Sequence, residues 1–255
     1  METSTPFYQL IKPTPGTGEL VNVATDLNGN WDKIDQDMNR SQIDFFTATG
    51  TWNKPARARR VSVEVVGGGA SGGGTAATGV SQAAQAGGGG GGGYSRKIFD
   101  AATLASSETV TIGAGGAAAS SGANAGNNGG VSSFATAKAY VVTGNGGTSG
   151  SGGTASGGSI SISAGTGGTA SGGDLNISGS NGGIGAVRAA SVIPANHGGG
   201  SILGLDAKST GVNSNGAAGQ LYGGGSSGAT QDSASSGARA STAGAAGIVI
   251  VITFF

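Results

Sequence analysis

The stretch GGGGGGGYSRKIF, residues 87–99, decides how this chain can fold. Glycine loses more conformational entropy on ordering than any other residue, and it buries no side chain in return. A glycine run can nevertheless be ordered as a left-handed threefold extended helix without internal hydrogen bonds, as in polyproline II. Such helices could lie side by side and bond each other's N–H and C=O groups, because no Cβ keeps them apart. We therefore predict polyglycine II-like segments, with a strand at 94–99.

Other hydrophobic runs predict more strands around the glycine. The segment VSVEVV (61–66) alternates valine with polar residues, as a half-buried strand does. ETVTIG (108–113) and KAYVVT (138–143) are further strand candidates. GIVIVITFF (247–255) is apolar on both faces, so we expect a strand that is covered on both sides. The predicted fold is mainly β, a glycine-rich β-sandwich in which 61–66 and 247–255 pair or lie adjacent.

Composition sets the limits on structure and compartment. Of 255 residues, 56 are Gly, and only 10% are charged and 5% aromatic. Disorder is the alternative for such tracts, but 13 acids balance 13 bases, so we favour an ordered fold. Without Cys there is no disulfide or thiolate metal site. We also expect no secretory signal and no membrane insertion, because no apolar run approaches the roughly 20 residues of a membrane span.

Residues 1–44 look unlike the rest, and we assign them to attachment or oligomerisation. Leu27, Trp31, Ile34 and Met38 are spaced as an apolar helical stripe. The spacing predicts a short N-terminal helix, which is too short to be stable alone. It would pack in a small oligomeric bundle or against its own domain.

The remaining chain divides by composition. We expect a β-rich domain at 45–143, a Gly/Ser/Ala-rich distal insertion or tip at 144–246, and the closing strand at 247–255. GGTASGGSISIS (152–163) recurs as GGTASGGDLNIS (167–178). Stacked turns of this kind can build a solenoid-like stalk.

Charge is concentrated near the start of the chain. Residues 1–50 hold seven acids against three bases, and residues 51–100 hold six bases against two acids. An ordinary solvated surface explains this distribution. Alternatively, the acidic start packs on the basic stretch of a neighbouring subunit. We favour the first interpretation, because surface ion pairs contribute little.

Few residues of this sequence are suited to catalysis or to holding a cofactor. A glycosidase needs two positioned carboxylates, and the acids after residue 100 are far apart in sequence: Glu108, Asp174, Asp206 and Asp232. His197 is the sole histidine. The basic cluster RARR (57–60) runs directly into a strand, which favours a strand-edge or interface role over nucleic acid. We predict a non-enzyme with no cofactor, no metal and no nucleic-acid partner.

Binding candidates are the large or polar side chains that are rare in the distal region, since loops carry recognition and such side chains anchor interfaces. The candidates for receptor contact are Arg188, Asn196, His197, Asp206, Lys208, Gln220 and Tyr222. For Leu203 and Leu221 the alternative is that they fill a small core between glycine layers. We favour this alternative for both leucines.

Several motifs together resemble one family. GTWNKPARARRVSVEVVGGGASGGG (50–74), GGGGGGGYSRKIFDAATL (87–104) and AAGIVIVITFF (245–255) resemble the glycine-rich domain of phage tail and tail-fibre proteins. PTPGTGELVNVATDLNGNWDKID (13–35) resembles their N-terminal attachment segments. The resemblance implies a virion tail component, extracellular after release and contacting a host surface glycan or outer envelope protein. It also implies a homotrimer that joins other tail proteins through residues 1–44.

We thus predict a structural or adhesive part of a phage tail fibre or tail tip. The alternatives are a purely structural tail protein without receptor binding and a glycine-rich ice-binding or matrix protein. A depolymerase is a third alternative.

Overall fold

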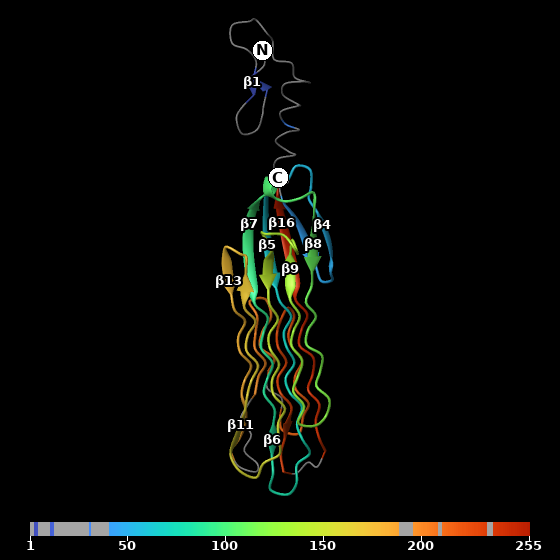
Figure 1. Cartoon of the computed structure of the whole chain (residues 1–255), viewed down its shortest axis with the longest axis vertical. Helices are drawn as coiled ribbons and strands as arrows, with labels where there is room; N and C mark the ends of the chain where they lie inside the picture. The colour runs from blue at the N-terminus through green and yellow to red at the C-terminus, as the bar shows by residue number, and fades with distance from the viewer. Residues whose placement is uncertain are drawn as a thin grey trace, which may run out of the picture.

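The computed structural model is an elongated molecule with a β-sandwich at one end and a bundle of extended glycine-rich segments reaching the other end (Figure 1). It describes residues 3–4, 11–12, 31, 41–188, 196–208, 211–233 and 237–255. The named strands among these residues all pair antiparallel. The predicted mainly β fold is confirmed.

Two five-stranded sheets form the sandwich. The first sheet has the order β13-β7-β5-β16-β3, and the second has β12-β10-β9-β8-β4. The strands of the first sheet are β3 (Ser41–Phe46), β5 (Arg60–Val66), β7 (Tyr94–Asp100), β13 (Leu175–Ile177) and β16 (Ile248–Phe254). Those of the second sheet are β4 (Gly50–Asn53), β8 (Ser107–Thr111), β9 (Ser132–Phe134), β10 (Val142–Gly144) and β12 (Ala170–Ser171). A 3-10 turn, η2 (Ala101–Thr103), follows β7.

The closing strand lies where the sequence predicted it. β16 pairs with β5 along its whole length, with Val249 opposite Val65. The other hydrogen-bonding edge of β16 pairs with β3. The core between the two sheets is built from alternate residues of facing strands and three aromatic side chains, Trp52, Phe99 and Phe134. The rings of Trp52 and Phe134 contact each other at a tilt of 60° with their centroids 5.7 Å apart, within the range that aromatic pairs prefer.

The predicted N-terminal helix is not supported. Leu27, Ile34 and Met38 lie outside the described residues, and the side chain of Trp31 is 62% exposed. Within the preceding part, β1 (Thr3–Ser4) and β2 (Ile11–Lys12) pair with each other.

Below the sandwich, the chain continues as extended segments that together form what we call the glycine lattice (Figure 1). Its segments are 67–75, 86–93, 113–119, 124–130, 145–153, 163–169, 179–183, 196–200, 216–220, 223–229 and 239–247. Short strands tie the far end, which we call the lower end: β6 (Ala84–Gln85) with β15 (Thr230–Gln231), and β11 (Ile160–Ile162) with β14 (Gly185–Val187).

Hydrogen bonds in the lattice repeat every three residues. Segment 67–75 donates from Gly67, Ala70 and Gly73 to 87–93, from Gly68, Ser71 and Gly74 to 124–130, and from Gly69 and Thr75 to 239–245. When each residue bonds to a different neighbouring segment than the residue before it, and every third residue bonds to the same segment, the chain has threefold helical symmetry. The predicted polyglycine II-like segments are therefore confirmed.

The seven-glycine run is enclosed on all sides. Its N–H groups donate in turn to segments 145–151, 180–183 and 223–226, and its carbonyls accept from 67–73, 165–168 and Gly199. These are six different neighbours, so no side of the run is left for a side chain.

The glycines are required for close approach and not for backbone conformation. A Cβ added at Gly90 would lie 1.9 Å from the carbonyl oxygen of Thr166. The other six glycines of the run would meet a backbone oxygen within 2.4 Å. None of the seven has a backbone φ in the left-handed region. The missing Cβ is thus the reason for the run.

The two copies of the internal repeat end at opposite ends of the molecule. Ile160 and Ile162 lie in β11, which pairs with β14. Leu175 and Ile177 lie in β13, which pairs with β7 in the sandwich. The copies therefore do not stack on each other as a solenoid-like stalk. Both 45–143 and 144–246 supply strands to the sandwich and segments to the lattice.

Candidate functional site

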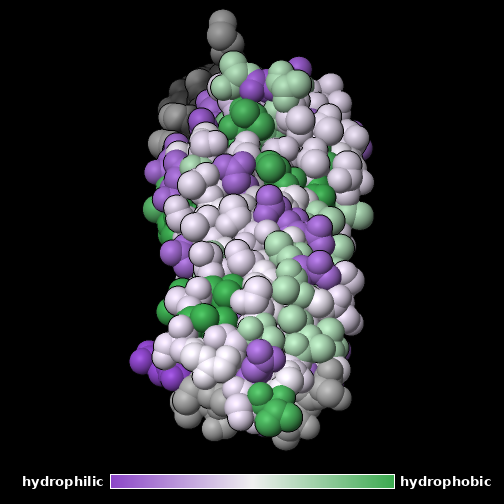
Figure 2. All heavy atoms as spheres, turned by 60° about the horizontal axis from the view of Figure 1, so that its bottom comes forward, coloured by the Kyte–Doolittle hydropathy of each residue, from purple (hydrophilic) through white to green (hydrophobic). Residues whose placement is uncertain are grey.

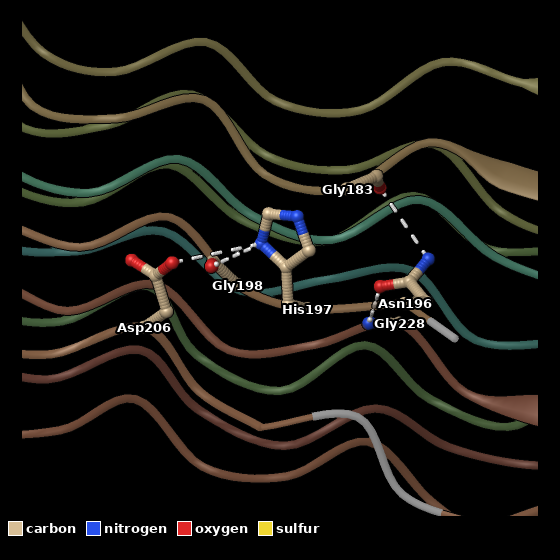
Figure 3. A network of polar contacts seen from close by, with 6 residues as sticks. All are labelled: Gly183, Asn196, His197, Gly198, Asp206 and Gly228. Atoms are coloured by element: carbon tan, nitrogen blue, oxygen red, sulfur yellow. Dashed lines mark hydrogen bonds and ion pairs between the residues drawn. The ribbon is translucent and has the colours of Figure 1, made fainter.

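The predicted receptor-contact residues occupy different parts of the lattice and do not form one surface. Asn196 is buried, with 1% of its surface exposed. Its side-chain amide donates to the carbonyl of Ala86 over 2.6 Å, and its Oδ1 accepts from the N–H of Gly228 over 3.2 Å. Figure 3 shows this side chain directed between chain segments. Asn196 therefore joins segments of the lattice.

His197, the next residue, is exposed and lies beside Asp206 (Figure 3). Its Nδ1 lies 2.9 Å from the carbonyl oxygen of Gly198 and 4.0 Å from an Asp206 carboxylate oxygen. Because a carbonyl oxygen only accepts, Nδ1 donates in the contact with Gly198. Both side chains are about half exposed, at 51% and 56%.

Two basic candidates are exposed toward the lower end. Arg188 follows β14 and lines a shallow pocket of about 340 Å³ together with Ile160 and Ile184. Lys208 is also exposed. Figure 2, which turns the lower end forward, shows a mostly pale surface on which small hydrophobic and hydrophilic patches lie side by side.

The last two candidates lie near the sandwich. Tyr222 packs against Val66, Tyr94 and Ile248 on the outer face of the first sheet. Gln220 is exposed. The leucines reverse our expectation: Leu203 and Leu221 are 41% and 63% exposed and do not fill a core between glycine layers.

The lower end holds exposed apolar residues that sequence reasoning missed. Val80 is 93% exposed, and Ile184 and Val212 are 59% and 52% exposed. Val80 lies in the turn between segment 67–75 and β6. The available signal was that Val80 is the one large apolar residue in the stretch TAATGVSQ (75–82).

The four acids beyond residue 100 are held in four separate places. Glu108 is buried in the sandwich, where its carboxylate accepts from the hydroxyl of Tyr140 over 2.7 Å. Asp174 accepts from the backbone of Ile98, Asp206 faces His197, and Asp232 accepts from the amide of Asn213. No two of them are arranged as a catalytic pair.

Two tyrosines have altered acidity. The hydrogen bond to Glu108 raises the pKa of Tyr140 above its ordinary value of 10.0. Burial, reinforced by Glu64, raises the pKa of Tyr94. Both shifts favour the neutral phenol, which indicates structural and not nucleophilic roles.

The described residues contain no group of three or more His, Cys, Asp or Glu side chains that could hold a metal ion. In the same part of the chain, no helix has the length and apolar character needed to cross a membrane.

The fold and the scattered surface residues define an elongated glycine-rich β-protein with a side-chain core in the sandwich and a lattice held together by backbone hydrogen bonds. The chain belongs to the glycine-rich domain family, whose model matches residues 46–253. A comparison with curated proteins found no match.

Proposed function

We propose that this protein is a structural and adhesive component of a phage tail fibre or tail tip, with its lower end contacting the host cell surface. The observation that carries the proposal is the enclosure of Gly87–Gly93 by six hydrogen-bonded neighbours. A rod crosslinked in this way suits the task of holding recognition loops at a distance from an attachment point. The resemblance of 50–74 and 245–255 to tail-fibre domains adds support.

The distribution of side chains favours binding over catalysis. The enclosed run Gly87–Gly93 leaves no room for side chains, and the acids beyond residue 100 lie apart. At the lower end, the exposed apolar side chains of Val80, Ile184 and Val212 accompany the charge of Arg188. Exposed apolar groups with neighbouring polar ones are typical of contact surfaces.

The attachment end in this proposal is the sandwich with residues 1–44, which would join other tail proteins. The protein would be a homotrimer in the virion tail and extracellular after release. Its receptor would be a surface glycan or an outer envelope protein.

A binding experiment tests the proposal. Purified, fluorescently labelled protein is incubated with host cells, and its effect on adsorption of the phage that carries it is counted as plaques. Saturable cell binding that lowers adsorption is the expected result. Protein that neither binds cells nor competes would point to the purely structural tail role.

One observation favours ice binding as a second candidate. On one face of the lattice, the hydroxyls of Thr148 and Thr166 lie 2.9 Å apart, and Asn145 donates to Thr169 over 2.9 Å. The polar side chains form regular rows, but the rows mix Asn, Thr and Ser. A thermal hysteresis assay tests this candidate, and we expect no activity.

A further inference from the structure

The outer face of the first sheet is unusually apolar for a surface. Ile43 and Phe45 on β3, Ile98 on β7 and Phe254 on β16 point outward and are 50%, 65%, 50% and 42% exposed. The sheet register brings the residues of β3 and β16 together, because Ile43 lies opposite Ile252 and Phe45 opposite Ile250. Ile98 lies one strand further along, beyond Ser62 of β5, and the neighbouring row of β5 and β7 carries the Arg96–Glu64 ion pair. A contiguous patch of large apolar side chains on a soluble chain indicates an interaction surface.

The outer face of the second sheet provides an internal comparison. It carries small polar side chains in register, with Thr51 opposite Thr109 and Ser133 opposite both Thr111 and Thr143. An antiparallel sheet with one solvated face shows this alternation of apolar inside and polar outside. The outer face of the first sheet does not follow this alternation, which indicates that another surface covers it in the assembled protein.

A basic pocket continues this apolar face at its upper edge. The pocket has a volume of about 580 Å³, and its lining includes Arg59, Arg60, Asp100, Ile98 and Phe254, so two bases there outnumber one acid. Arg60, Phe254 and Ser41 lie in one row of the sheet, since Phe254 is opposite both other residues. The chain that precedes Ser41 therefore begins at the edge of the pocket.

The sequence before Ser41 has the complementary chemistry. Residues 26–38 hold four acids, Asp26, Asp32, Asp35 and Asp37, against the single base Lys33. Four large apolar residues alternate with them: Leu27, Trp31, Ile34 and Met38. The apolar residues of this segment suit the apolar face, and its acids suit the two arginines at the edge of that face. Complementary charges of this kind set the choice of partner and the register of contact.

We propose that the outer face of the first sheet, with the Arg59–Arg60 pocket at its edge, binds the acidic segment 26–38 of a second copy of this chain. A second copy is favoured because Trp31 is 62% exposed in the single chain. Each copy offers one face and one segment, so reciprocal exchange produces a closed oligomer. The inference goes beyond the proposed function and holds whether or not the protein binds cells.

Sedimentation equilibrium of the full chain over a range of concentrations tests the inference. We expect an oligomer whose dissociation constant rises at least tenfold in Phe45→Ser and in Trp31→Ser. Because the two side chains belong to one contact, the double variant should dissociate no more than about twofold more easily than the weaker single variant. Ile98→Thr provides a second variant on the face.

Leu205→Ser is the matched control, because it removes an apolar side chain that is 80% exposed and lies outside the first sheet, and it should leave the dissociation constant unchanged. Thermal unfolding of each variant verifies folding. A wild-type chain that stays monomeric throughout overturns the inference. So does a Phe45→Ser variant that associates normally, or a Trp31→Ser variant that associates normally while Phe45→Ser does not.

Discussion

Replacing Gly90 with alanine tests whether close approach requires glycine in the lattice. The added Cβ would lie 1.9 Å from the carbonyl oxygen of Thr166, a backbone atom that cannot rotate away. Overpacking of a tight interior costs about 1–3 kcal/mol. If the segments separate, the hydrogen bonds of Gly90 with Ala70 and Thr148 weaken, at about 1 kcal/mol each. Lower entropy of the unfolded chain offsets about 0.4–1 kcal/mol. We expect Gly90→Ala to lower the free energy of unfolding by about 2–5 kcal/mol.

Gly158→Ala is the matched control, because an added Cβ there meets nothing within 4 Å. This variant should be neutral or more stable by up to about 1 kcal/mol. Guanidinium unfolding followed by circular dichroism and by tryptophan fluorescence measures both variants. Equal unfolding midpoints for the two variants would refute the reasoning, since glycine at position 90 would then have no steric purpose.

Three further predictions concern single side chains. Asn196→Ala should lower the free energy of unfolding by about 1–3 kcal/mol, because it leaves buried backbone groups without partners; the exposed Asn215→Ala should have little effect in the same melts. Tyr140→Phe should flatten the fall in Tm between pH 9 and pH 11. The pKa of Tyr140 is raised in the folded state by Glu108, so its contribution is complete below about pH 10 and is lost as pH rises through the folded value; an unchanged slope would exclude this role. Val80→Glu should reduce cell binding at least tenfold without changing Tm, and undiminished binding would move the receptor surface away from the lower end.

Sequence patterns were most informative where one local rule decides the structure. Alternating valines predicted β5, and the doubly apolar run 247–255 predicted a central strand beside it. The glycine run predicted the threefold helices, because few other ordered structures suit consecutive glycines. KAYVVT was partly misjudged: its first residues form turns, and β10 begins only at Val142.

The candidate site was harder to predict, because position in the lattice depends on neighbours distant in sequence. Adjacent residues of a threefold helix point in directions a third of a turn apart. Asn196 therefore points inward while His197 points outward. Leu221 and Tyr222, in the turn between two lattice segments, also differ, with one exposed and the other packed on the first sheet. Composition marked these residues as unusual but carried no information about which neighbour each one faces.

The three-residue period also constrains how such a gene can change over evolutionary time. Deleting one codon within segment 87–93 would rotate everything beyond it by a third of a turn and break its pairing with six neighbours. Removing three codons would restore the angular phase, with a change in length of about 9 Å. Lasting length changes should therefore occur in triplets of residues, matched in adjoining segments, while the turns at the lower end can vary freely in length.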